Sequence, residues 1–169
     1  MDIASLFNAF SAWSQSIAVT WGYLGIFLIS LIGSATILFP VPAFFVVFAS
    51  GAVLNPWLVG IAAGAGSALG ELTGYGIGFA GEKAISKKHE KWLKRANEWA
   101  GKYKMFTVIV IFAATPLPDD IVGILCGVIK YDVKRFFLAS LTGKLIMNVS
   151  IALGGYYGLQ WVIAVFGGI

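Results

Sequence analysis

The sequence predicts an all-α, polytopic membrane protein, and three observations lead to this fold class: the composition, the distribution of charge, and apolar segments broken by prolines. Hydrophobic residues make up 59% of the 169 residues and charged residues only 12%, which lies outside the range of soluble domains. Residues 3–70 contain no Asp, Glu, Lys, Arg or His, so this stretch must face lipid or other protein. We expect one membrane domain, 1–169, without a cleaved signal peptide, because Asp2 stands where such a signal has a positive segment.

The first half of the chain predicts an interfacial helix followed by a hairpin. Residues 1–21 mix apolar and polar side chains, which is typical of a helix that lies on the lipid surface or is partly inserted. Residues 22–54 are apolar but contain Pro40 and Pro42, and the arm after the prolines is too short to cross at about 1.5 Å per residue. We therefore expect the chain to turn back here, in the first part of a repeat over 22–80.

A spanning helix is predicted over 57–80, because Asn55-Pro56 is a helix-start signal and an apolar segment rich in small residues follows it. Gly-x-x-x-Gly spacings in this segment allow the backbone of another helix to approach closely. The glycines expected at such close helix packing are Gly66, Gly70, Gly74, Gly78 and Gly127.

The centre of the second half is apolar from residue 105 to 129, except for two prolines and two adjacent carboxylates. Neither a core helix nor a spanning helix tolerates that combination without a reason. We interpret the segment as a re-entrant hairpin, which enters the membrane, breaks and leaves by the same side. The breaks of the two hairpins are expected at Pro40, Pro42, Thr115, Pro116 and Pro118. An apolar span over 136–166 then completes a second repeat, 105–166.

Between the repeats, residues 81–104 predict an amphipathic helix that lies on an anionic membrane surface, because aromatic and apolar residues fall on one helical face and basic residues on the rest. The residues expected to bind that surface are Lys87, Lys88, Lys91, Trp92, Lys94, Arg95 and Trp99. Since the basic residues are concentrated locally, the net charge of +4 indicates topology and not a nucleic-acid partner.

The two halves are predicted to form an inverted repeat. Their proline pairs align at a constant offset, and each half reads as a broken hairpin, a turn and a span. The positive-inside rule places residues 82–104 and 130–135 together in the cytoplasm only if 105–129 returns to the side it entered. The hairpins then enter from opposite sides with their tips meeting near the midplane, in a multi-pass protein of the plasma membrane.

Four ionisable residues lie inside the apolar segments: Glu71, Asp119, Asp120 and Lys144. A charge at the bilayer centre costs about 2.5–3.5 kcal/mol on insertion scales, so such residues usually have a function. Glu71 and Lys144 are predicted at similar depth and can pair, while the aspartates begin a half-helix whose N-terminus favours a negative charge. Together with Asn148 these residues form the predicted site for a substrate or a coupling proton. The alternative is that Asp119 is only a helix cap and Glu71 with Lys144 only a structural ion pair.

Three stretches carry a resemblance to a known family: the Pro-x-Pro hairpin at 40–42, the Ala-Leu-Gly-Glu-Leu-Thr-Gly-Tyr-Gly-Ile-Gly run at 68–78, and Thr-Pro-Leu-Pro-Asp-Asp at 115–120. The chain resembles the DedA/VTT (SNARE-associated) membrane family, its small prokaryotic branch above all. The resemblance implies paired re-entrant hairpins and movement of lipids, including polyprenyl-phosphate carriers in some members and phospholipid scrambling in eukaryotic relatives. Many bacterial members have arginines beside the second proline motif, where this chain has Ala113 and Ala114.

We expect a lipid transporter rather than an enzyme, because the sequence has no nucleophile–base pair, no metal-binding cluster and no nucleotide loop. It would be a flippase or scramblase for an anionic polyprenyl phosphate or a phospholipid, with a polar midplane site between the two re-entrant hairpins. No cofactor is expected; the partners are membrane lipids, with protons as a candidate coupling ion and a homo-oligomer as an open option. Two alternatives remain, a proton-coupled transporter of a small solute or ion and a membrane scaffold that transports nothing.

Overall fold

The computed structural model describes residues 21–36, 41–102, 105–115 and 119–166. Every regular element within these ranges is a helix. The predicted interfacial helix over 1–21 lies outside them except for Trp21, and so do Pro40, Pro116 and Pro118. The side chains predicted to bind the membrane surface, Lys87, Lys88, Lys91, Trp92, Lys94, Arg95 and Trp99, are also outside the described part.

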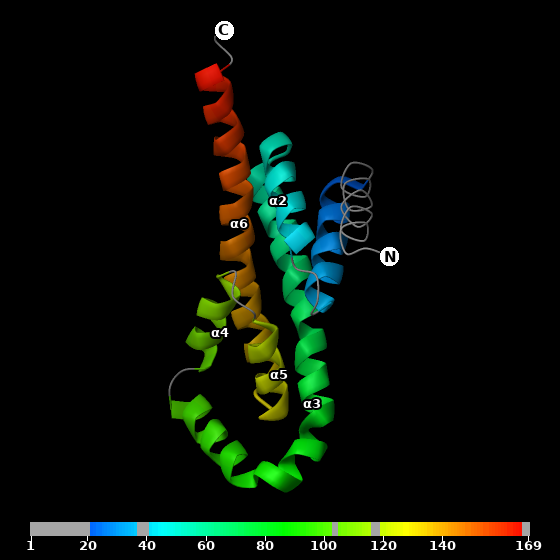
Figure 1. The fold of residues 1–169 in the computed structure, drawn as a ribbon, viewed down its shortest axis with the longest axis vertical. Coiled ribbons are helices and arrows are strands. Elements are labelled where there is room, and N and C mark those ends of the chain that lie inside the picture. Colours follow the sequence, from blue (N-terminus) through cyan, green and yellow to red (C-terminus); the bar gives the residue numbers. More distant parts are fainter. Residues whose placement is uncertain (1–20, 37–40, 103–104, 116–118, 167–169) are drawn as a thin grey trace, which may run out of the picture.

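Six helices follow one another in the described part of the chain. An unlabelled first helix, Trp21–Ala35, is followed by α2 (Val41–Val53), α3 (Pro56–Lys102), α4 (Met105–Ala113), α5 (Asp120–Val128) and α6 (Val133–Phe166). The long helices α3 and α6 lie side by side along the molecule, and the short helices pack around them (Figure 1).

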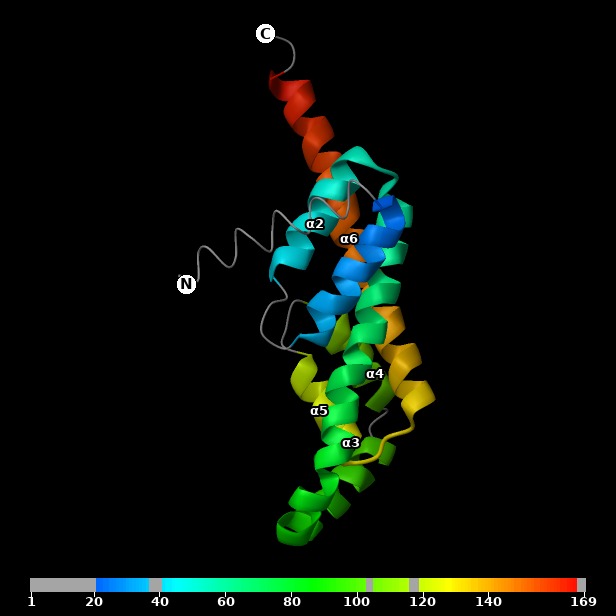
Figure 2. The ribbon, with the colours of Figure 1, turned by 90° about the vertical axis from the view of Figure 1, so that its right-hand side faces the viewer.

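Each proline-containing break is flanked by two short helices that run in opposite directions. In Figure 1 the Trp21–Ala35 helix runs downward and α2 returns upward, whereas α4 runs upward and α5 returns downward; Figure 2 shows the same for the first pair from the side. The two helical hairpins therefore point toward each other along the long axis of the molecule.

The predicted change of chemistry at residue 81 does not interrupt the helix. Helix α3 continues from the Gly-rich segment into the basic segment as one element, and its second half curves away from α6 (Figure 1). A glycine inside a helix costs only about 1 kcal/mol relative to alanine, so Gly81 is not enough to end it. The span predicted over 57–80 and the amphipathic helix predicted over 81–104 thus share one continuous backbone.

Glycines bring α3 and α6 together as antiparallel neighbours. A Cβ on Gly60 would lie 2.5 Å from the Val149 Cα, and one on Gly64 would lie 2.9 Å from the Leu145 Cα. On another face of α3, a Cβ on Gly70 would lie 2.6 Å from the backbone oxygen of Leu31. Only glycine permits such close backbone contacts, which are typical of helix packing in membranes.

The second helix of each hairpin packs on the long helix of the other half. A Cβ on Gly127 of α5 would overlap the backbone oxygen of Tyr75 in α3, and a Cβ on Gly78 of α3 would overlap that of Ile124. The α2–α6 contact is built in the same way, because a Cβ on Gly155 would overlap the backbone oxygen of Phe48. Of the remaining predicted packing glycines, Gly66 faces the Phe27 backbone oxygen. Gly74 is less crowded, since its Cβ would make an ordinary contact of 3.6 Å with Asp120.

Helix α3 begins with the predicted Asn55-Pro56 signal. The Asn55 Oδ1 accepts hydrogen bonds from the backbone N–H groups of Trp57 (3.0 Å) and Leu58 (3.3 Å). We expect Asn55→Ala to lower the free energy of unfolding by about 1 kcal/mol, because it leaves these N–H groups without their side-chain acceptor. Thermal unfolding of the detergent-solubilised protein measures this change, with Asn55→Asp as the control that keeps the acceptor. Equal stability of the Ala and Asp variants would contradict the capping role.

Candidate functional site

The structure brings three of the predicted ionisable residues into one buried cluster. The Lys144 Nζ, from the middle of α6, lies 2.9 Å from the Glu71 Oε1 of α3 and 2.6 Å from the Asp119 Oδ2. Lys144 and Glu71 are 5% and 3% exposed, so their charges are almost wholly removed from solvent. We call Glu71, Asp119 and Lys144 the charged cluster.

Asp119 immediately precedes α5, yet its side chain does not cap the helix, because no hydrogen bond joins its carboxylate to the first turn. The carboxylate instead pairs with Lys144. The cap interpretation of Asp119 is therefore wrong for this structure. Asp120 is half-buried in the first turn of α5, and its backbone oxygen faces Gly74 of α3.

Polar residues extend the cluster along α6 at intervals of one turn. Asn148 is 2% exposed, and its Nδ2 donates a 2.8 Å hydrogen bond to the backbone oxygen of Lys144. Ser140, one turn on the other side of Lys144, is equally buried. Sequence reasoning included Asn148 but missed Ser140. The sequence does contain a pattern that points to Ser140. Residues spaced by four share one helical face, and this face of α6 carries Phe136, Ser140, Lys144 and Asn148.

A small cavity adjoins the charged cluster on the α4–α5 side. Its polar lining comes from Glu71, Asp119 and Ser140, and apolar residues that include Val122 and Phe136 close the rest. Its volume of about 10 Å³ is near the minimum that holds one water molecule. Two carboxylates and a hydroxyl therefore face a space large enough for a single small polar group.

Two apolar clusters lie on opposite sides of the charged cluster along the long helices. The α2-side cluster consists of Ile26, Ile29, Ala43, Val46, Val47, Val59, Ala63 and Ala152. The α4–α5-side cluster consists of Met105, Ile109, Val122, Cys126, Ile129, Phe136 and Ala139. Along α6, Ala152 comes two turns after Lys144 and Phe136 two turns before it, so the charges are enclosed between two apolar layers.

Contacts of Tyr75 hold α3 against the start of α6 on the α4–α5 side. The Tyr75 hydroxyl donates a 2.6 Å hydrogen bond to the backbone oxygen of Tyr131, in the turn between α5 and α6. The Tyr75 ring also packs against Phe136, with ring centroids 5.2 Å apart, and Phe136 is 1% exposed. These contacts join α3 to the start of α6 just beyond the cavity.

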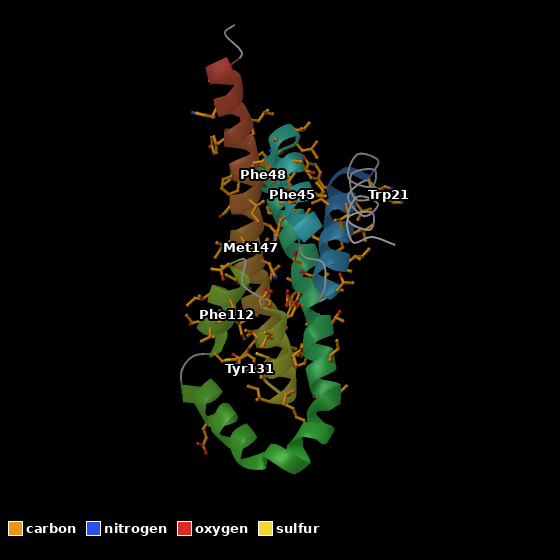
Figure 3. All side chains as sticks on the ribbon, in the orientation of Figure 1. Trp21, Phe45, Phe48, Phe112, Tyr131 and Met147 are labelled. Atoms are coloured by element: carbon orange, nitrogen blue, oxygen red, sulfur yellow. The ribbon has the colours of Figure 1, made fainter. Side chains whose placement is uncertain are left out.

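The ends of the long helices carry the residues typical of the two edges of a bilayer. Trp57 and Trp161 are exposed near one end, where Figure 3 also shows Trp21 pointing outward, in the opposite half of the molecule from Tyr131. Lys134 is exposed at the other end of α6. At about 1.5 Å per residue, Lys144 lies roughly 15 Å along α6 from Lys134 and roughly 25 Å from Trp161.

Length and composition single out one helix able to cross a membrane among the described residues, the segment Val133–Trp161 of α6. The Trp21–Ala35 and Ala43–Val53 helices are apolar but shorter. The charged cluster thus lies deep within the molecule, at the level of the middle of the segment that is long and apolar enough to cross.

Residues 41–157 match the family model of the VTT domain. The chain belongs to the VTT domain family. The match includes the whole charged cluster, helices α2 to α5, and α6 as far as residue 157. It confirms the predicted membrane-protein family, and the described residues agree with it, because their regular elements are all helices and one of them is apolar and long enough to span.

Among curated proteins, this VTT-domain chain is similar to the vacuole membrane protein KMS2 of Arabidopsis thaliana, with 35% identity over 105 residues. The alignment covers 52% of this chain and 25% of KMS2, so the chain spans about a quarter of its relative's length. None of the solved structures matches the chain.

Proposed function

We propose that this VTT-domain protein moves lipids between the leaflets of the plasma membrane, with the charged cluster as the site that the headgroup passes. The observation that carries the proposal is the enclosure of Lys144, Glu71 and Asp119 between two apolar clusters. A charge-lined site with an apolar barrier on each side is what a carrier needs to bind a polar group without opening a continuous leak.

The proposal includes an inverted repeat of two re-entrant hairpins. It is supported by the opposite directions of the hairpin helices and by the matching contacts of α5 on α3 and of α2 on α6. The α5–α3 contact uses Gly127 and Gly78, and the α2–α6 contact uses Gly51 and Gly155. Since each hairpin is held by the long helix of the other half, tilting one half against the other changes both barriers at once.

In this mechanism the acyl chains stay in the lipid and only the headgroup enters the protein. Separation of the α4–α5-side cluster exposes the charged cluster to the basic end, and separation of the α2-side cluster exposes it to the aromatic end. The apolar outer surface fits the lipid tails, because large side chains such as Phe45, Val53 and Trp161 are more than half exposed.

The test is lipid movement in vesicles reconstituted with the purified protein. Lipids labelled on the acyl chain report leaflet exchange when a membrane-impermeant reductant bleaches the outer leaflet. The double variant Lys144→Ala with Asp119→Asn is expected to lose this exchange, whereas Glu98→Gln, which removes an exposed carboxylate, keeps it. Unchanged exchange in the double variant would remove these residues from the mechanism.

A second candidate, a proton-coupled transporter of a small solute or ion, is favoured by the ratio of two carboxylates to one lysine in the cluster. A carboxylate without a full counter-charge is a natural proton carrier. Solute uptake driven by a pH gradient, in vesicles where lipids do not exchange, would support this candidate in place of lipid movement.

We also propose that the second half of α3 binds the cytoplasmic membrane surface through the basic and aromatic residues of 82–104. The continuity of α3 supports this, because one continuous helix then connects the surface to Glu71 in the charged cluster. The anionic lipid of that leaflet is the expected partner.

A further inference from the structure

The charged cluster has more negative than positive charge. Lys144 contributes one positive charge, and both Glu71 and Asp119 are within ion-pair distance of its Nζ. Asp120, the half-buried residue directly after Asp119, adds to the negative side. The sequence has no other basic residue in 1–82, 105–129 or 136–169, so no second cation from these segments balances the cluster.

We propose that Asp119 selects lipids by headgroup charge: it makes the cluster accept zwitterionic headgroups and reject anionic ones. This inference rests on the proposed lipid movement and names the class of lipid that is moved. An anionic headgroup brings a further negative charge to a site where Lys144 is already paired twice, and the like charges oppose its entry.

A zwitterionic headgroup enters the same site without changing its net charge. Its phosphate takes Lys144 as partner, and its ammonium takes the carboxylate that Lys144 releases. An ammonium group suits that place, because the Lys144 Nζ is itself an ammonium and lies 2.6 Å from the Asp119 Oδ2. Every charged group then keeps a partner of opposite sign, which a buried site requires.

Asp119, rather than Glu71, is the carboxylate that exchanges partners. Its side chain is 14% exposed against 4% for Glu71, and it lines the cavity together with Ser140. Asp119 immediately precedes the nine-residue helix α5 and has no capping bond that fixes it, whereas Glu71 stands inside the 47-residue helix α3. A small movement at the start of α5 therefore frees Asp119 while Glu71 stays on Lys144.

The experiment compares exchange of a phosphatidylethanolamine, whose headgroup carries a primary ammonium, and a phosphatidylglycerol, both labelled on the acyl chain, in vesicles of one fixed composition. The wild-type protein is expected to exchange the zwitterionic lipid at least roughly tenfold faster than the anionic one. Asp119→Asn leaves Lys144 paired with Glu71 alone, and it is expected to bring the two rates within about twofold of each other. Glu98→Gln is the matched control, since it removes an exposed carboxylate and is expected to keep the wild-type ratio.

Each outcome of this experiment supports or contradicts the proposed headgroup selectivity. Equal rates for both lipids in the wild-type protein would overturn the selectivity while leaving lipid movement in place, and this comparison needs no variant to fold. An unchanged ratio in a folded Asp119→Asn protein would show that another residue selects the headgroup. If neither lipid exchanges in the wild-type protein, the proposed function fails together with the inference.

Discussion

Lys144→Met is expected to abolish lipid exchange and to lower the free energy of unfolding by about 3–5 kcal/mol. The methionine fills much of the volume of the lysine, but it leaves Glu71 and Asp119 without a counter-charge in a buried place. Breaking a buried ion pair from one side is costly for this reason. Unfolding by denaturant in detergent measures the stability, and bleaching of labelled lipids in vesicles measures the exchange.

The control for this prediction neutralises the whole cluster. In the triple variant Lys144→Met, Glu71→Gln and Asp119→Asn the charged cluster holds no unpaired charge, so most of the lost stability is expected to return while lipid exchange stays absent. A single Lys144→Met protein that is as stable as the wild type would contradict the buried ion pairs. A triple variant that exchanges lipids normally would show that the charges are structural only.

Gly127→Ala is expected to lower the free energy of unfolding by about 1–3 kcal/mol and to slow lipid exchange severalfold. The added methyl group would overlap the backbone oxygen of Tyr75 and would lie 2.6 Å from the backbone nitrogen of Phe79. Backbone atoms cannot move aside as a side chain can by changing its rotamer, so α5 must move away from α3. That movement also draws Asp119 away from Lys144.

Gly76→Ala is the matched control for the packing prediction. It follows Tyr75, the residue of α3 that Gly127 contacts, but a Cβ on Gly76 meets nothing within 4 Å. Alanine is the better helix former, so this variant is expected to be as stable as the wild type or up to about 1 kcal/mol more stable. Equal effects of the two substitutions in thermal unfolding would contradict the close approach of α5 to α3.

The sequence predicted the parts of the fold that depend on local chemistry. The Asn55-Pro56 start of α3 and the short helices around the two breaks follow from proline, capping and apolar length. The pairing of Glu71 with Lys144 followed from counting residues from the basic end, since both lie at the same depth. Each of these inferences needs only one segment and its rise per residue.

Other parts of the site depend on how separate helices meet, and no local pattern specifies that. Asp119 pairs with Lys144 because α5 lies against α3 through Gly127 and Gly78, whereas the local pattern favoured a cap. Ser140 becomes a candidate site residue only because it lines the cavity, which the structure shows. The continuity of α3 through residue 81 was also missed, because a change from apolar to basic residues alters the surroundings of a helix without breaking its hydrogen bonds.

The central claim is that the chain turns back inside the membrane between α4 and α5, so that the ends of α3 and α5 lie on one side. The test uses single cysteine substitutions in a Cys126→Ala background. Two of them replace the exposed residues Glu98 and Lys134, and the third replaces Val53, which is 80% exposed at the other end of the molecule. Labelling of intact cells with an impermeant thiol reagent is expected to modify the cysteine at 53 and to spare those at 98 and 134 until the membrane is opened. Modification of only one of the cysteines at 98 and 134 in intact cells would place them on different sides of the membrane and contradict the account.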